Sequence, residues 1–231
     1  MAHEHSHDPD SPAGRRAFLG KLAVTAAAGA AGLTLTSALD GPSELLAATP
    51  SIGPDAEHWL DPLKGKHKQL VDAFAPNEGF PLAFAFTFMA AQAPADLPAG
   101  AVVVLRHMAM PFALNSSLWE RYKIGEAIKL MDPQTQKPAT RNPFYKAPAG
   151  SLEIDDMAVD KLMAKGVIFG ACNMALHFLS GMLAANAGVS KEAAAKEWAE
   201  GIIPGITIIP SGTWGVNRAQ EKGCTYCSGG G

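Results

Sequence analysis

Side chains able to do chemistry follow three apolar stretches of the sequence. Cys172 ends one stretch, His107 ends another, and Ser211 follows a third. A thiol, an imidazole and a hydroxyl can serve as nucleophile, base and hydrogen-bonding group. These residues can act together only if the fold brings the ends of the three stretches to one place.

Cys172 precedes residues 173–186, which are apolar on nearly all sides and predict a buried helix. The N-terminus of a helix favours the thiolate, the reactive form of cysteine. The alternative is an inert cysteine that packs as a small apolar side chain. Cys172 and His107 are the candidate catalytic residues. Their sequence neighbours, Asn173 and Arg106, are candidate ligand-binding residues.

Two histidines are candidates for a role beside the thiol. His107 can act as a base, an ion-pair partner or a metal ligand if it meets a thiolate, although a structural histidine is the alternative. His177 lies in an apolar setting and is expected to be a core residue unless a cofactor lies next to it. A heme or metal held by His107, Cys172 or His177 therefore stays open, and the cofactor is not assigned.

The pair Ser211-Gly212 precedes a predicted helix and can offer backbone N–H groups to an anion. An ordinary N-cap serine is the alternative. Motifs of nucleotide enzymes, zinc proteases and serine hydrolases are missing from the sequence: Gly-x-Gly-x-x-Gly, the phosphate-loop lysine motif, His-Glu-x-x-His and Gly-x-Ser-x-Gly. The sequence therefore favours a binding or thiol function over these reactions.

Cys224 and Cys227 form a Cys-x-x-Cys pair near the end of the sequence. Ser228 follows where covalent heme attachment needs a histidine, and a structural zinc needs four ligands. We expect either a local disulfide or a redox pair that resolves Cys172.

The elements that must position these residues alternate between strand and helix. Strands are predicted at residues 80–89, 101–107, 167–172, 202–209 and 223–227. Helices are predicted near 64–74 and over 116–129, 152–165, 173–186, 190–200 and 211–222. This order predicts an α/β fold with a mostly parallel sheet and helices on both faces. Ligands in such folds bind beyond the carboxyl ends of the strands, which is where Cys172, His107 and Ser211 are expected to meet.

The first 49 residues are predicted to be a signal region, and residues 50–79 an N-terminal extension. Arg15 and Arg16 precede a mildly apolar run and are typical of a twin-arginine export signal. We therefore expect the Tat translocase as a partner and a periplasmic location. The net charge of −3 disfavours nucleic acid as a partner.

Residues 131–150 have no helix or strand period, and prolines recur in them every five residues. This is either chance in a proline-rich loop or a lid, binding loop or oligomer arm. A periplasmic protein partner could bind here, through side chains suited to interfaces. These are Arg141, Asn142, Phe144 and Tyr145.

Several segments resemble the DsrE/DsrF-like family. They are Gly166–Leu176, which contains Cys172; Val103–His107; Ile208–Gly212; and Asn217–Tyr226. The resemblance covers about residues 80–228 and implies a flavodoxin-like α/β domain that assembles into homo-oligomers, trimers or hexamers. It also implies that the cysteine at position 172 accepts sulfur as a persulfide. We therefore expect an exported protein that handles a sulfur species or small ligand. The alternatives are a heme or metal carrier and a structural subunit of a periplasmic complex.

Overall fold

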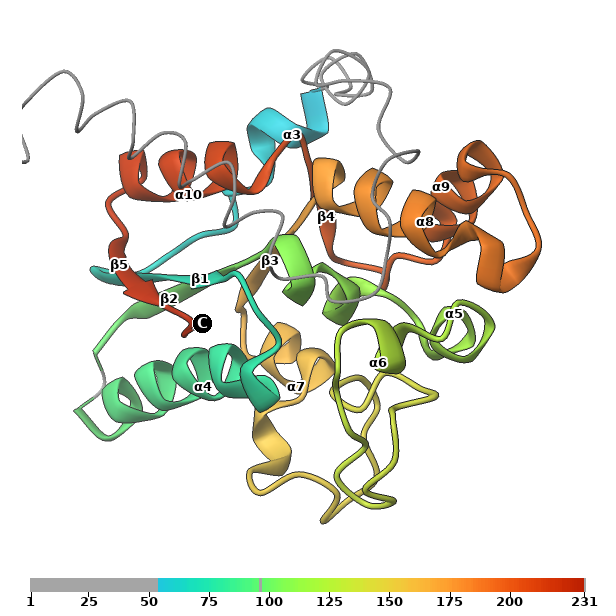
Figure 1. The fold of residues 1–231 in the computed structure, drawn as a ribbon. Helices are drawn as coiled ribbons and strands as arrows, with labels where there is room; N and C mark the ends of the chain where they lie inside the picture. The colour runs from blue at the N-terminus through green and yellow to red at the C-terminus, as the bar shows by residue number, and fades with distance from the viewer. Residues whose placement is uncertain (1–53, 96, 231) are drawn as a thin grey trace, which may run out of the picture. The chain divides into compact units, whose positions relative to one another are not determined.

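Five parallel strands form one sheet in the computed structural model, which describes residues 54–95 and 97–230 (Figure 1). The strands are β1 (His67–Ala73), β2 (Ala99–Leu105), β3 (Ile168–Cys172), β4 (Thr207–Ile209) and β5 (Thr225–Ser228). Their order is β4-β3-β2-β1-β5, and all neighbours pair in parallel. The predicted flavodoxin-like α/β arrangement is confirmed, although this order is not the 2-1-3-4-5 order of flavodoxin itself.

Helices cover both faces of the sheet. On one face α10 (Gly212–Glu221) packs across β1 to β4, and α3 (Pro54–His58) contacts β4. On the other face α4 (Phe80–Gln92) packs against β1 and β2, with α7 (Val159–Ala164) next to it (Figure 1). The remaining helical segments are η1 (Asn77–Gly79), η2 (Ala93–Ala95), η3 (His107–Ala113), α5 (Ser116–Arg121), α6 (Ile124–Ala127), η4 (Asp155–Met157), α8 (Asn173–Ala187) and α9 (Lys191–Glu200).

The centre of the sheet is apolar because β2 is buried on both faces. Val102 and Val104 belong to a small cluster under α10 that also includes Ile209. Val103 and Leu105 belong to the larger cluster on the opposite face. Strand side chains alternate between faces, so a strand buried on both sides reads as a continuous apolar run.

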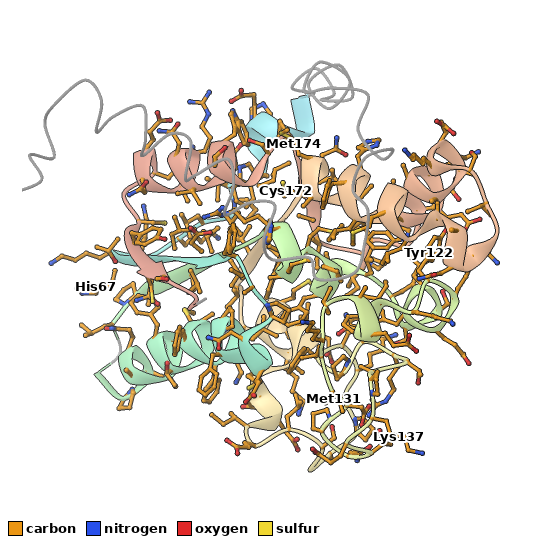
Figure 2. The ribbon with its side chains drawn as sticks, viewed as in Figure 1. His67, Tyr122, Met131, Lys137, Cys172 and Met174 are labelled. Atoms are coloured by element: carbon orange, nitrogen blue, oxygen red, sulfur yellow. The ribbon has the colours of Figure 1, made fainter. Side chains whose placement is uncertain are left out.

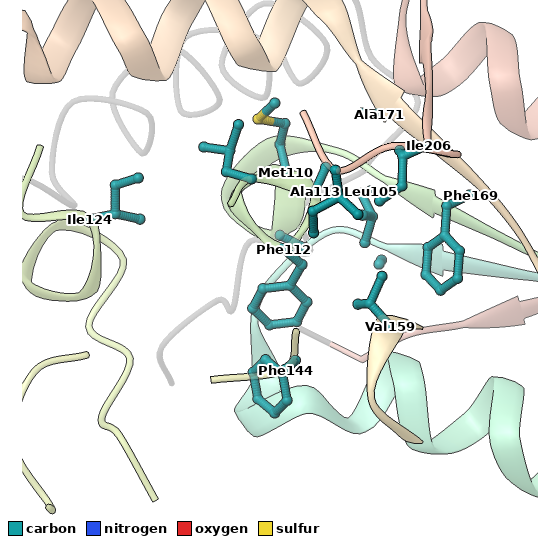
Figure 3. Close-up of a cluster of buried hydrophobic side chains, with 14 of the residues drawn as sticks. Leu105, Met110, Phe112, Ala113, Ile124, Phe144, Val159, Phe169, Ala171 and Ile206 are labelled. Carbon is teal, nitrogen blue, oxygen red and sulfur yellow. The ribbon is translucent and has the colours of Figure 1, made fainter. Parts of the chain in front are cut away.

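The larger cluster continues beyond the sheet into η3 and the segment that follows it. Phe112 packs on Phe144 with ring centroids 4.7 Å apart, and both rings are buried. Figure 3 shows these rings near Leu105, Phe169 and Val159. The segment after β2 is therefore part of the core, and it fixes the residues at the end of that strand.

Two sequence predictions near the start of the domain were wrong. Residues 80–89 form helix α4 and not a strand, because a continuous apolar run does not distinguish the two. Phe, Ala, Leu and Met tolerate a helix, and Pro81 occupies its first turn. The predicted helix near 64–74 is instead strand β1, which pairs with both β2 and β5. The α/β domain therefore includes residues assigned to an extension of 50–79.

Other predicted elements are shorter than expected. The helix at 116–129 is divided into α5 and α6, and Lys123 between them has a positive φ of 51°. Asn115 caps α5 by accepting a hydrogen bond from Ser117 N at 3.1 Å. The helix at 152–165 is reduced to η4 and α7, and the strand at 202–209 to β4.

In the second half of the fold, the observed elements agree best with those predicted from the sequence. Strand β3, helix α9 with its Ser190 cap, helix α10 with its Ser211 cap, and strand β5 are confirmed. Helix α8 is confirmed in extent, but Met182 on it is 43% exposed, so it is not buried on all sides.

Some features predicted from the sequence lie outside the described residues. These are the predicted export signal with Arg15 and Arg16, and the mature N-terminus. Among residues 54–95 and 97–230, no helix has the length and apolar character needed to cross a bilayer.

Candidate functional site

The carboxyl ends of three neighbouring strands surround a pocket of about 240 Å³. Arg106 and His107 enter it after β2, Cys172 enters from the end of β3, and Ser211 follows β4. The remaining lining residues are Phe74, Met108, Met174, Ala175, Phe178, Leu179, Gly212 and Thr213. The structure thus brings together the three residues that sequence analysis expected to meet, while their chemical roles stay predictions.

Cys172 lies where strand β3 turns into helix α8. It is the N-cap of that helix, and its Sγ accepts a hydrogen bond from Ala175 N at 3.3 Å. The residue is 5% exposed and is among the residues that line the pocket. A backbone N–H directed at sulfur, at the positive end of a helix, stabilises negative charge on that atom.

His107 is held in an uncommon backbone conformation beside the pocket. Its φ is +48°, in the left-handed region that few residues other than glycine adopt. Its ring stacks on Phe74 at 4.2 Å between centroids, with 5° between the planes. Burial, and then the positive charge of Arg106, lower the pKa of His107. The imidazole is therefore neutral at neutral pH and can accept a proton.

Arg106 is fixed by a buried carboxylate on the adjacent strand. Its Nε donates to Asp72 Oδ1 at 2.6 Å and its Nη2 to Oδ2 at 2.8 Å. Asp72 is 4% exposed, and it also accepts a hydrogen bond from the Tyr226 hydroxyl at 2.9 Å. The hydrogen bond to Asp72 raises the pKa of Arg106 and of Tyr226. The guanidinium carbon lies 4.7 Å from the Phe74 ring centre.

The start of helix α10 closes the other side of the pocket. Ser211 Oγ accepts a hydrogen bond from Trp214 N at 3.2 Å, so the N-cap interpretation of Ser211 is correct. A Cβ atom at Gly212 would overlap the Arg106 side chain. Glycine at this position lets the first turn of α10 approach the arginine closely.

Two other predicted residues lie near the pocket without lining it. Asn173 is 5% exposed at the first position of α8. His177 is half-buried one turn further along, and burial lowers its pKa. Neither residue is part of the pocket lining. Within residues 54–95 and 97–230, no group of three or more His, Cys, Asp or Glu side chains is placed to hold a metal ion.

Cys224 and Cys227, which the sequence predicts as a disulfide or a redox pair, are not bonded to each other in this structure. Both are free thiols, and they pack in different hydrophobic clusters on opposite faces of the sheet. Residues three apart on an extended chain point to opposite faces, which explains the separation. Cys227 is also a poor partner for Cys172, because β1 and β2 lie between β5 and β3. Strands about 4.8 Å apart put β5 and β3 roughly 14 Å from each other.

The proline-spaced segment 131–150 is anchored in the fold by a few buried residues, while most of its other residues are exposed. Asn142 is fully buried, and its Nδ2 donates to Phe112 O at 2.9 Å and to Leu114 O at 2.8 Å. Phe144 packs on Phe112, so Asn142 and Phe144 are unavailable to a partner. Figure 2 shows Met131 and Lys137, in this segment, well away from Cys172 and Met174.

The residues that hold Arg106 in place were not among the predicted site residues. Asp72 and Phe74 lie at the end of β1, which was predicted as a helix, and Tyr226 lies on β5. The available signal was an acidic residue directly after the apolar pair Leu70-Val71. An acid in a buried strand usually has a partner.

The fold and the pocket define an α/β protein with a cysteine-lined pocket at its strand ends. The sequence matches no protein-family model, and no curated protein matches it significantly. Among solved structures, a protein of unknown function from Methanobacterium thermoautotrophicum is similar, with a TM-score of 0.39 and 15% identity. The alignment covers 71% of this chain and 99% of that one.

Proposed function

We propose that the protein is an exported DsrE/DsrF-like protein that handles a sulfur species or a small ligand at its strand ends. The observation that carries this proposal is the pocket in which Cys172 and His107 follow neighbouring strands. Ligand sites of open parallel sheets lie at this edge.

In the proposed reaction the Cys172 thiolate attacks the terminal sulfur of a persulfide donor, R–S–SH. A bond forms between Cys172 Sγ and that sulfur, and the S–S bond of the donor breaks. Its electron pair leaves with R–S⁻, so the products are a Cys172 persulfide and the donor thiolate. The exchange needs no external oxidant or reductant.

The surroundings of Cys172 fit a sulfur acceptor. The N–H of Ala175 directed at Sγ favours negative charge on the sulfur. Neutral His107, in the same pocket, can accept the proton that the thiol loses. The mostly apolar walls reduce the access of water to the sulfur. Each of these features favours reaction with a small donor that enters the pocket.

Export and self-association are parts of the same proposal. The arginine pair at positions 15 and 16 supports export by the twin-arginine pathway. Helix α4 contains no charged residue, and Phe80 at its start is 49% exposed. An uncharged helix with an exposed phenylalanine supports an oligomer in which this surface is covered.

Sulfur loading tests the proposal. The reduced protein is incubated with glutathione persulfide, and each cysteine peptide is then examined by mass spectrometry. We expect the peptide containing Cys172 to gain one sulfur atom and the Cys172→Ala variant to gain none there. Cys227→Ala is the matched control, since it removes a partly buried thiol outside the pocket and should leave loading unchanged. Loading at Cys227 but not at Cys172 would show that the sulfur-handling proposal is wrong.

A further inference from the structure

Arg106 presents hydrogen-bond donors that the fold does not use. A guanidinium has five N–H donors, and two of them bond to Asp72. Among the described residues no acceptor engages the other three. The side chain is 24% exposed and lines the pocket, so these donors are accessible to a ligand there.

The arginine is held rigidly, which suits recognition of a ligand. It donates two parallel hydrogen bonds to the Asp72 carboxylate, which also accepts a hydrogen bond from the Tyr226 hydroxyl. The guanidinium also lies over the Phe74 ring. A fixed planar fork loses little conformational entropy when it binds a planar carboxylate.

A second donor group lies against Arg106. Gly212 lets the first turn of the ten-residue helix α10 pack on the arginine stem. The first N–H groups of a helix have no partner within the helix, and here the Ser211 hydroxyl accepts from one of them, Trp214 N, besides sharing a hydrogen bond with the Thr213 hydroxyl. The backbone at Gly212 and Thr213, which both line the pocket, therefore adds to the attraction for an anion.

The rest of the pocket is apolar and small. Met108, Met174, Phe178 and Leu179 line it together with the exposed ring of Phe74. The volume of about 240 Å³ is below the usual range for drug-sized ligands. A bare inorganic anion would leave this apolar surface uncovered, whereas a compact apolar body would cover it.

We propose that the pocket binds a small amphipathic carboxylate, with its anionic group on Arg106 and its apolar body against Phe74, Met108 and Phe178. This inference rests on the same pocket as the proposed function and names the class of ligand that the pocket takes. The ligand carries one carboxylate on an aromatic or short aliphatic body. Its binding covers Cys172, which lines the same pocket.

Calorimetric titration of the wild-type protein with matched probes measures separately how much the anionic group and the apolar body of the ligand contribute to affinity. Benzoate supplies both parts, benzamide keeps the ring without the charge, and acetate and sulfate supply charge without the ring. We expect benzoate to bind at least about tenfold more tightly than each of the others, because a charge-assisted pair and ring burial both contribute. Equal affinity for benzamide, or for sulfate, would overturn the inference.

Variants assign the binding to Arg106. Arg106→Lys keeps the charge and a partner for Asp72 but loses the planar fork, so benzoate affinity should decrease about tenfold. The matched control is Arg121→Lys, which alters another two-bond arginine–carboxylate pair, with Glu197, outside the pocket. Circular dichroism checks that both variants fold. Unchanged benzoate affinity in folded Arg106→Lys would contradict the assignment.

The two proposals can fail independently. Benzoate should slow sulfur loading of Cys172 in proportion to its occupancy, because both need the same pocket. Sulfur loading without benzoate binding would overturn the ligand class and leave the sulfur proposal standing. Benzoate binding to a protein whose Cys172 takes up no sulfur would overturn the sulfur proposal and leave the ligand class standing.

Discussion

The two regions of the molecule that contain thiols differ in what surrounds the sulfur. Cys172 lies at the carboxyl end of an interior strand, caps a fifteen-residue helix and lines a pocket. Cys224 and Cys227 lie at the edge strand β5, and neither lines that pocket. Burial raises the pKa of Cys224 to about 11 and also raises that of Cys227. Its place at a helix N-terminus and in the pocket lining, and not its solvent exposure, distinguishes Cys172 from the other two thiols.

Strand β5 supports the pocket indirectly, although none of its residues lines it. Tyr226 lies on β5 between Cys224, which precedes the strand, and Cys227, and its hydroxyl donates a hydrogen bond to Asp72. Asp72 in turn holds Arg106 at the pocket. The edge strand therefore supports the site through a partly buried hydrogen-bond network, and this dependence can be tested.

Removing the carboxylate of Asp72 should give the largest effect. Asp72→Ala leaves Arg106 without its partner in a mostly buried setting, and we expect a loss of about 3 kcal/mol in the free energy of unfolding. Urea denaturation measures this loss. Glu200→Ala, which removes an exposed pair with Lys196, is the control and should cost less than about 0.5 kcal/mol. Equal effects of the two substitutions would show that the Asp72–Arg106 pair has no special role.

A hydroxyl in place of the thiol of Cys224 or of Cys227 should have a smaller effect on stability and none on the sulfur loading of Cys172. Cys224→Ser puts an unpaired hydroxyl among Leu70, Val102 and Ala219, so we expect a loss of about 1–2 kcal/mol. Cys227→Ser should cost less, because that side chain is only partly buried. Both variants should load sulfur at Cys172 at the wild-type rate. Reduced loading in either would mean that the two thiol regions are coupled.

The pH dependence of stability should show the smallest effect. The pKa of His107 is lowered in the folded protein, so the unfolded state binds more protons between that pKa and about 6.5. Stability should therefore increase with pH across this window, by at most about 1.4 kcal/mol per pH unit for one proton. His107→Asn, which tolerates the left-handed conformation, should reduce the slope. The part of this pH dependence that is due to His177 remains in the variant. If the slope of stability against pH did not change at all, the assignment of part of it to His107 would be wrong.

The sequence predicted the second half of the fold and the meeting of three strand ends because those signals are local. Strand β3, the cysteine and helix α8 form one continuous pattern, and Ser190 and Ser211 are recognisable caps. The network around Arg106 has no local signal. Asp72 is 34 residues from Arg106, and Tyr226 is 154 residues from Asp72. Such pairs become visible only when the strand order is known.

The errors at the start of the domain have a related cause. In β1, Lys68 and Gln69 interrupt the apolar pattern, because the first half of the strand is only partly buried. In α4, phenylalanines and alanines cover nearly every side, so neither helical nor strand periodicity is visible. Tertiary contacts determined both elements: β1 is held between β2 and β5, and α4 packs on β1 and β2.

The relative alkylation rates of the three thiols test the central claim most directly. The native, reduced protein is treated with a limiting amount of iodoacetamide at neutral pH, and the modified cysteines are identified by mass spectrometry over time. Exposure alone predicts that the partly buried Cys227 reacts first. Our account predicts the order Cys172, Cys227, Cys224, with modification of Cys172 slowed by benzoate. Modification of Cys227 before Cys172 would contradict the account, because the strand-end thiol would then have no special reactivity.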